Sequence, residues 1–500
     1  MGKKNFALGK NIFNINKIEP IDLLNELSEK IKYGCAVGVD GRSYDYFRNN
    51  KDAIINEMND SIHNESYTLS PYKEMLLIKG RNEYPRCLSI PTIQDKLFLY
   101  FILNQIDRLD SSLKLPLPQQ VIGKLIKSLG EVSSRKDVYI AKYDIRHFFN
   151  SINHKILFKE IDELIINKVG ILDISDKFLI ESCRKAIQNP TLPIRKKNYK
   201  GVPQGIPIAS ELSQIYFSKI ELALRRKDVE VFRYVDDIIL ICHMEKKEEI
   251  KNLFLKEIES NKLSINSKKI KEGDISSLDL DFLGYNFSLY KKNESLKVSV
   301  KEVNIKKIKQ RIVAMIRVLK NKKNPEYLIF RLNCFIAGSI FKNGDKKSKY
   351  GWIFFYSQIN DIELLYQLDR FIKGKLMEYL PNLNRDNLRT LTIDSLSENE
   401  RSMFRDSPLD LSTFVRKSRG VGHLHLNSFV TSYRAIKSKK NIERYSNCFY
   451  KYSNDDKYFI LSEILKIKNI NRKTPLDKKI YKYVYSQIEE TEKDIFDSIS

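Results

Sequence analysis

The sequence from Phe232 to Ile241 reads FRYVDDIILI and places two adjacent carboxylates between runs of β-branched and aromatic residues. Such runs are typical of buried strands, so the stretch predicts a β-hairpin with Asp236 and Asp237 at its turn. Two carboxylates this close repel each other unless a cation lies between them. Mg²⁺ is a hard ion that prefers carboxylate oxygens. The pair therefore indicates a metal site, and the simpler interpretation is a solvated turn.

A site for two metal ions needs another carboxylate from a separate strand. The run from Val138 to Phe149 (VYIAKYDIRHFF) supplies it in Asp144, which ends a mostly apolar, strand-like segment. The segment Ser151–His154 then predicts the start of a helix. The long separation of Asp144 from Asp236 leaves room for a helical crossover between the two strands.

A loop rich in glycine and proline lies between these two acidic segments. It runs from Gly201 to Ser210 (GVPQGIPIAS) and is followed by Glu211–Ser218, whose apolar spacing predicts a helix. Glycine allows the backbone to approach a ligand closely. We expect this loop to face a nucleotide and a template strand.

In this order, the three segments resemble the palm motifs of reverse transcriptases. Leu263–Lys269 (LSINSKK) resembles the lysine-bearing motif of the palm, and Phe282–Phe287 (FLGYNF) resembles the primer-grip hairpin. Upstream, Lys79–Arg81 and Arg86–Lys96 resemble the fingers segment that meets the triphosphate. The resemblance covers residues 75–290, with a weaker thumb-like continuation to residue 380.

The resemblance implies an α+β fold of the right-hand polymerase type, with fingers, palm and thumb and a helical C-terminal extension. A helical stripe among lysines from Val300 to Leu319 is typical of a thumb helix, and Asn, Asp and Ser become frequent after residue 380. We therefore predict four segments. They are an N-terminal extension (1–75), fingers and palm (76–290), a thumb-like helical region (291–380) and a helical, basic C-terminal domain (381–500).

The same resemblance implies roles for the acids. Asp144 and Asp236 would bind two Mg²⁺ ions, with the Ile145 carbonyl as an extra ligand. Asp237 would complete the catalytic, metal-binding cluster and help to place the primer end. The ions would activate the primer 3′-hydroxyl and neutralise the pyrophosphate, and Mn²⁺ could replace Mg²⁺. A turn or a helix cap is the simpler interpretation of each aspartate.

Contacts to the incoming dNTP are implied as well. Arg86 and Lys79 would hold the triphosphate, since Arg offers a planar fork and Lys a point charge. Phe149 lies where the family excludes a ribose 2′-hydroxyl, Gln204 would contact the nucleotide or template, and Lys269 would protonate pyrophosphate. The alternatives are solvated charges for Arg86, Lys79 and Lys269, core packing for Phe149 and a backbone hydrogen bond for Gln204.

Composition supports a polyanionic partner. The chain has 87 basic and 63 acidic residues, for a net charge of +24, and 11% of its residues are aromatic. Lysine and arginine release counterions when they neutralise phosphates, and aromatic rings can stack on bases. A length of 500 residues predicts two to four domains.

Other patterns narrow the class of protein. No apolar run is long enough for a membrane span, and Leu97–Leu103 is expected to be a buried helix. Gly34–Gly41 lacks a dinucleotide fingerprint, and Asp40 within it is expected to be a turn aspartate. The cysteines show neither zinc nor disulfide spacing, which indicates a reducing cytoplasm. They are Cys35, Cys87, Cys183, Cys242, Cys334 and Cys448.

The chain most resembles bacterial defence-associated and abortive-infection reverse transcriptases. It lacks a Cys/His nuclease module after the thumb-like segment, the Val-Thr-Gly signature of retron enzymes, and the acidic motifs of an RNase H or integrase. This resemblance implies RNA-directed DNA synthesis in anti-phage defence, a dedicated non-coding RNA as template, a DNA product and self-assembly into a homo-oligomer.

Two alternatives stay open. One is template-independent or protein-primed DNA synthesis at the same site, since a tyrosine hydroxyl can act as a nucleophile. The other is a non-enzymatic, maturase-like protein that binds RNA. Arg416–Arg419 and Lys437–Lys440 are candidate RNA contacts or simply solvated surface. The late tyrosines, which packing would also explain, are Tyr445, Tyr450, Tyr452, Tyr458, Tyr481, Tyr483 and Tyr485.

Overall fold

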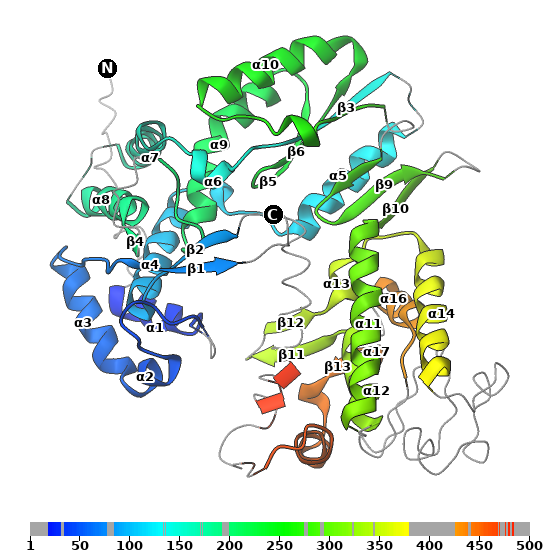
Figure 1. Cartoon of the computed structure of the whole chain (residues 1–500). Helices are drawn as coiled ribbons and strands as arrows, with labels where there is room; N and C mark the ends of the chain where they lie inside the picture. Colours follow the sequence, from blue (N-terminus) through cyan, green and yellow to red (C-terminus); the bar gives the residue numbers. More distant parts are fainter. Residues whose placement is uncertain are drawn as a thin grey trace, which may run out of the picture. The chain divides into compact units, whose positions relative to one another are not determined.

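The computed structural model separates the chain into two compact units, and each is described by itself (Figure 1). Unit 1 comprises Met1–Val121 and Arg135–Asp274, and unit 2 comprises Ile122–Ser134 and Ile275–Ser500. This division differs from the four segments predicted from the sequence. The structure describes residues 19–31, 35–77, 85–133, 135, 137–170, 172, 174–192, 200–274, 279–290, 295–322, 325–343, 346–379, 426–438, 442–468, 470, 476, 479–480 and 483–484.

Unit 1 is built around a four-stranded antiparallel sheet of order β5-β6-β3-β7. Its strands are β3 (Val138–Asp144), β5 (Glu230–Tyr234), β6 (Asp237–His243) and β7 (Lys271–Gly273). Because side chains alternate along a strand, Tyr139, Ala141 and Tyr143 of β3 join the core on one face of the sheet. Lys142 and Asp144 therefore project from the opposite face.

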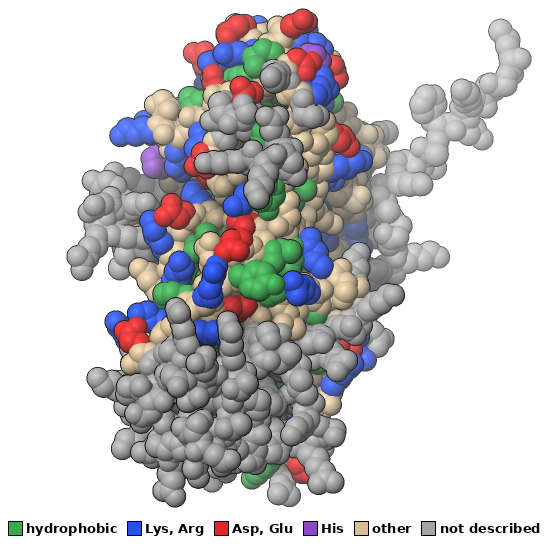
Figure 2. Space-filling model, turned by 90° about the vertical axis from the view of Figure 1, so that its right-hand side faces the viewer, with side chains coloured by type: hydrophobic (Ala, Val, Ile, Leu, Met, Phe, Trp, Pro, Cys, Tyr) green, Lys and Arg blue, Asp and Glu red, His purple; other side chains and the backbone are tan. Residues whose placement is uncertain are grey.

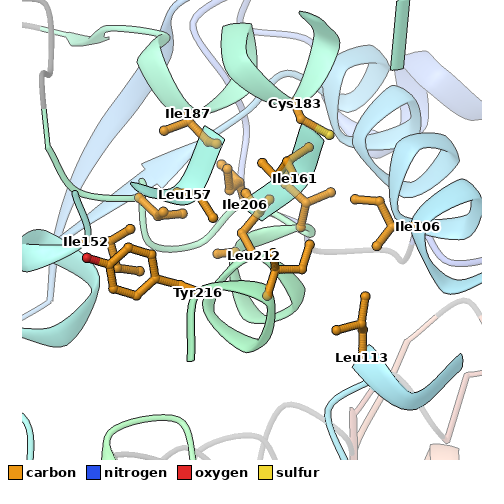
Figure 3. Close-up of a cluster of buried hydrophobic side chains, with 14 of the residues drawn as sticks. Ile106, Leu113, Ile152, Leu157, Ile161, Cys183, Ile187, Ile206, Leu212 and Tyr216 are labelled. Carbon is orange, nitrogen blue, oxygen red and sulfur yellow. The ribbon is translucent and has the colours of Figure 1, made fainter. Parts of the chain in front are cut away.

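Helices α9 and α10 pack against each other and against strands β5 and β6 (Figure 1). The helices of this part are α6 (Phe148–Ser151), α7 (His154–Val169), α8 (Ile174–Gln188), α9 (Ala209–Arg225) and α10 (Lys247–Ser260), with 3₁₀ turns η2 (Met244–Lys246) and η3 (Ser267–Lys269). Figure 3 shows how α4, α7, α8 and α9 bring apolar side chains together. This core fixes α9, which carries the chain from the glycine loop to β5.

The N-terminal part of unit 1 carries a second sheet of order β2-β1-β4. Helices α1 and α3 contact each other and α4. The buried Asp95 accepts hydrogen bonds from Thr92, Tyr67 and Ser70, which secures the start of α4. The elements are α1 (Pro20–Ser28), α2 (Tyr44–Asn49), α3 (Lys51–His63), β1 (Tyr72–Leu77), β2 (Arg86–Ile90), α4 (Ile93–Leu109), η1 (Ser111–Leu113) and β4 (Thr191–Leu192). Helix α5 (Pro118–Val132) begins in unit 1, and its residues from Ile122 on belong to unit 2.

Unit 2 begins with the sheet β10-β9-β8. Strands β8 and β9 are joined by Leu283 and Gly284, which both have positive φ, as a type I′ hairpin turn requires. The predicted helix at 300–319 is confirmed as α11. The elements are β8 (Leu280–Phe282), β9 (Tyr285–Leu289), β10 (Leu296–Val300), α11 (Glu302–Lys322), α12 (Pro325–Ala337), β11 (Ser339–Asn343), β12 (Lys346–Tyr350), α13 (Trp352–Phe355) and α14 (Ile362–Tyr379).

The described residues after 425 add a strand and core side chains to elements that lie earlier in unit 2. Strand β13 pairs in parallel with β11, and Phe449 and Ile460 share a core with Phe330 and Phe341. The described residues after 425 therefore share a hydrophobic core with α12 and β11, which lie in the predicted thumb-like region. The elements are α16 (Phe429–Ser438), α17 (Ile442–Tyr445), β13 (Asn447–Cys448), η5 (Phe449–Lys451), α18 (Asn454–Phe459) and the π-helical turn η6 (Ile460–Ile464).

A buried aspartate of α14 anchors this returning segment. Asp369 accepts hydrogen bonds from the Ser428 hydroxyl (2.7 Å) and from the backbone N–H groups of Phe429 (2.8 Å) and Val430 (3.4 Å) at the start of α16. Asp369→Ala leaves these buried donors without an acceptor, so we expect the free energy of unfolding of unit 2 to fall by about 3 kcal/mol. Limited proteolysis should then cut near α16 earlier than in the parent protein. An equally resistant variant would show that this contact does not anchor the segment.

A buried glutamate of α9 predicts a pH-dependent stability. Burial, followed by the charge of Asp107, raises the pKa of Glu211 to about 7. In the structure, Glu211 Oε2 and Asp107 Oδ1 are buried without a hydrogen-bond partner. The folded state therefore binds a proton that the unfolded state has released, and stability falls as the pH rises from about 4.5 to about 7.

Glu211→Gln should remove this slope. We expect the free energy of unfolding to rise by about 2 kcal/mol at pH 8, because no buried charge remains, and to change little at pH 5. Thermal unfolding at both pH values measures the effect. Glu259→Gln, on an exposed position of α10, is the control and should leave the pH dependence unchanged. The interpretation is wrong if Glu211→Gln has the same effect at pH 5 and pH 8.

Within the described part of the chain, no helix has both the length and the apolar character that a bilayer crossing requires. All six cysteines are free. On the face drawn in Figure 2, the described Lys and Arg side chains are mixed with acidic and hydrophobic ones. Arg416–Arg419 lies outside the described residues, as do Lys439 and Lys440.

Candidate active site

The turn between β5 and β6 is tight and strained. Tyr234 pairs with Asp237, so Val235 and Asp236 alone form the turn. Val235 has φ of 58°, in the left-handed region that β-branched residues rarely adopt. The Arg233 guanidinium donates from Nη1 to the Val235 carbonyl at 2.9 Å. The turn is therefore held in an unfavourable conformation by neighbouring structure.

Strand pairing brings the three predicted acids together. Asp144, the last residue of β3, lies directly opposite Asp237, the first residue of β6. The backbone N–H of Ile145 donates to the Asp236 carbonyl at 3.1 Å, which ties the end of β3 to the turn. Residues that are far apart in the sequence thus meet at one end of the unit 1 sheet.

Two lysines and an asparagine contact these acids. Lys269 Nζ lies 2.8 Å from Asp144 Oδ2, and Asn266 Nδ2 donates to Asp144 Oδ1 at 3.2 Å. Lys142 Nζ lies 3.3 Å from Asp237 Oδ1. These groups offset the mutual repulsion of the carboxylates.

Desolvation and a neighbouring charge make the ionised form of Asp236 costly. Burial, followed by the charge of Asp144, raises the pKa of Asp236 to about 6, while Lys269 and Arg86 act in the opposite direction. The carboxylate is ionised at neutral pH but at an energetic cost. A divalent cation beside it would favour the ionised form.

The donor set fits hard divalent cations. Within the described residues, no three acid, histidine or cysteine side chains are arranged to hold a metal ion as they stand. Asp144 and Asp237 are instead paired with Lys269 and Lys142. The Lys269 side chain is 60% exposed, so it can leave Asp144. Beside the Ile145–Ile265 bridge, the Asn266 N–H donates to the Asp144 carbonyl and the Arg146 N–H donates to the Ser264 carbonyl. Neither of these two hydrogen bonds uses the Ile145 carbonyl. Carboxylates and a backbone carbonyl are the oxygen ligands that Mg²⁺ accepts.

The glycine loop packs on the fingers strand β2. The Ser89 N–H donates to the Gln204 carbonyl at 2.7 Å, so the backbone of Gln204 makes the contact. Gly205 has φ of +98°, and a Cβ there would lie 3.0 Å from the Ser89 carbonyl oxygen. Arg86, in the same strand, is close enough for its charge to lower the pKa of Asp236. Lys79 lies outside the described residues.

Phe149 connects the loop to the acidic segment. Its carbonyl accepts a hydrogen bond from the Val202 N–H at 2.8 Å. Its half-buried ring lies 5.8 Å from that of Phe148, between centroids. Gly201 has φ of +88°, and a Cβ there would lie 3.2 Å from the Asn150 Cα. Core packing and contact with a nucleotide are both compatible with this position.

Sequence reasoning missed three residues of this site. Lys142 lies two residues before Asp144, so strand alternation alone places both on one face. Asn266 lies inside the segment that was identified as the lysine-bearing motif. Arg233 has no local signal, because its ionic partner Glu221 comes from α9.

Residues 78–287 match the family model "Reverse transcriptase (RNA-dependent DNA polymerase)". This segment is a reverse transcriptase domain. It includes the three acids and the glycine loop, and it lies within the 75–290 region where the sequence resembles this family. The match confirms the expected α+β class of the right-hand polymerases. The description of this family names an RNA-dependent DNA polymerase, that is, a nucleotidyltransferase. None of the curated proteins matches the chain.

Solved structures similar to the chain include two yeast telomerases. The apo telomerase of Candida tropicalis, truncated from its C-terminal domain, is 17% identical over 50% of this chain and 60% of that chain, with a TM-score of 0.36. The telomerase of Candida albicans, in complex with a TWJ fragment of telomeric RNA, is 15% identical over 72% of this chain and 66% of that chain, with a TM-score of 0.35. The chain thus spans less than two thirds of either telomerase chain.

Proposed function

We propose that the whole chain is an RNA-directed DNA polymerase that extends a primer by two-metal transfer of dNTPs. The observation that carries this proposal is the meeting of Asp144, Asp236 and Asp237 at the end of β3 and the β5–β6 turn. The family match over residues 78–287 supports it.

In this proposal, Asp144, Asp236 and the Ile145 carbonyl hold two Mg²⁺ ions, or Mn²⁺ in their place, and Asp237 completes the cluster. When bound, the ions activate the primer 3′-hydroxyl and neutralise the leaving pyrophosphate. Lys269 is paired with Asp144 in the structure and is free to move because it is exposed. It is then available to donate a proton to pyrophosphate.

The remaining predicted residues bind the dNTP. Arg86, in β2, holds the triphosphate, and Lys79 assists it. The Phe149 ring restricts space at the ribose 2′ position. Gln204 keeps its backbone on β2 and leaves its side-chain amide to contact nucleotide or template. Catalysis is then mostly positioning and charge stabilisation.

The biological setting is a further part of the proposal. The motif resemblance supports a role in bacterial anti-phage defence, in the cytoplasm, with a dedicated non-coding RNA as the template and a homo-oligomer as the working form. The net charge of +24 supports a nucleic-acid partner.

One experiment tests the function and separates its alternatives. Purified full-length protein with its co-purifying RNA is incubated with each dNTP, with and without RNase, and the product is sequenced. We expect a DNA product that copies the bound RNA and disappears after RNase treatment. RNase-resistant synthesis with a biased sequence would instead indicate template-independent or protein-primed activity. RNA binding with no synthesis under any condition would indicate a maturase-like protein.

A further inference from the structure

Lys142 is an unusual residue to find in a central strand. It lies in β3, which is paired with β6 on one side and with β7 on the other. Its side chain is 10% exposed. An ammonium group buried to this extent is costly unless a counter-charge lies beside it. A basic residue retained here requires a specific partner.

The register of the sheet supplies that partner. Lys142 lies opposite Ile239, so Asp237, two residues earlier in β6, is its diagonal neighbour on the same face. The long lysine side chain spans this diagonal and places Nζ 3.3 Å from Asp237 Oδ1. The Asp237 side chain is itself only 14% exposed. Both charges are therefore largely shielded from water.

The two lysines at the acidic cluster differ in their freedom. Lys269, which contacts Asp144, is the last residue of the short 3₁₀ turn η3 and is 60% exposed, so water can solvate it when a metal ion displaces it. Lys142 is held by a strand with neighbours on both sides, and at 10% exposure its ammonium would gain little water by leaving Asp237. The Lys269–Asp144 contact can therefore exchange, whereas the Lys142–Asp237 contact persists.

We infer that Lys142 is a positioning residue that holds Asp237 in a lasting ion pair, which keeps Asp237 away from the metal ions. This inference rests on the proposed two-metal function. Asp144, Asp236 and the Ile145 carbonyl then bind the ions, and Asp237 acts on the primer end from a fixed position. Lys142 also neutralises the charge of Asp237, which reduces its repulsion with Asp144 and Asp236.

The test uses the full-length chain and two readouts. Mn²⁺ binding is measured by electron paramagnetic resonance in the absence of nucleic acid. The kcat and KM for dTTP are measured on poly(rA) primed with oligo(dT). The variants are Lys142→Met, Lys142→Arg, Asp237→Asn, Lys142→Met with Asp237→Asn, Asp144→Asn and Asp236→Asn.

We expect Asp237→Asn to leave the Mn²⁺ affinity within about threefold of the parent, and Asp236→Asn to weaken it at least about tenfold. Lys142→Met should lower kcat at least about tenfold in the parent background but less than about threefold in the Asp237→Asn background, because the residues act as a pair. The KM for dTTP should change little. Lys142→Arg, which keeps the charge, should recover part of the lost kcat.

Two results would overturn the inference. One is a loss of Mn²⁺ affinity in Asp237→Asn as large as that in Asp236→Asn, because Asp237 would then be a metal ligand. The other is an equal effect of Lys142→Met in both backgrounds. The Asp237→Asn measurement decides the matter even if Lys142→Met fails to fold. Failure of the proposed function looks different: Asp144→Asn and Asp236→Asn would both keep Mn²⁺ binding and DNA synthesis.

Discussion

Replacing Asp236 with alanine is expected to lower DNA synthesis by about a thousandfold or more. Asp236 is half-buried near Asp144, and desolvation and that neighbouring charge raise its pKa to about 6. A cation bound beside this carboxylate would therefore stabilise its ionised form. Loss of a metal ligand removes several kcal/mol of transition-state stabilisation, and each 1.4 kcal/mol is about a factor of ten in rate. Primer extension on an RNA template measures this loss.

The same substitution should not harm the fold. Alanine removes the repulsion between Asp236 and Asp144, so without metal the thermal midpoint should stay equal or rise slightly, and RNA binding should be nearly unchanged. Asp60→Ala, on an exposed position of α3, is the control and should keep full activity. Full activity in Asp236→Ala would reject the proposed site.

Replacing Arg233 with methionine should destabilise unit 1 by about 3 kcal/mol or more. Arg233 is buried, pairs with Glu221 of α9, and lies over the Phe217 ring at 4.5 Å from the centroid. It also donates to the Val235 carbonyl of the strained turn. Truncation of a buried ion pair leaves the partner uncompensated, and the turn loses the bond that holds Val235 in the left-handed region. Both the thermal midpoint and DNA synthesis should fall.

A surface arginine offers a matched control. Arg225 reaches the same Glu221 at 3.6 Å, but its side chain is 57% exposed. Arg225→Met should therefore cost less than about 1 kcal/mol and leave synthesis intact. Arg233→Lys should recover little, because a single ammonium cannot reproduce the two separate guanidinium contacts. Equal midpoints for Arg233→Met and Arg225→Met would show that burial of the pair does not matter.

Local sequence patterns predicted the elements around the site. Runs of β-branched and aromatic residues on both sides of the Asp236–Asp237 pair predicted the β5–β6 hairpin, and the run ending in Asp144 predicted β3. The segment after the glycine loop is the predicted helix, α9. Each of these signals lies within a few consecutive residues, so it can be read without knowledge of the fold.

The unit boundaries depended on contacts that no local pattern records. A change in composition after residue 380 indicated a separate C-terminal domain. The structure instead pairs β13 with β11 and packs Phe449 against Phe341. A two-residue strand has almost no periodicity, and its partner lies about a hundred residues earlier in the chain. The residue composition therefore indicated where Asn, Asp and Ser become frequent, but it could not show which residues share a hydrophobic core.

The sequence by itself determined which acids are candidates for the site, their order, and the strands and loop that carry them. Only the tertiary structure decided which cation accompanies which acid, with exposed Lys269 on Asp144 and buried Lys142 on Asp237. The physical reason is that element type follows from neighbouring residues, whereas an ion pair depends on the register between strands. In this protein, that register joins residues about a hundred positions apart.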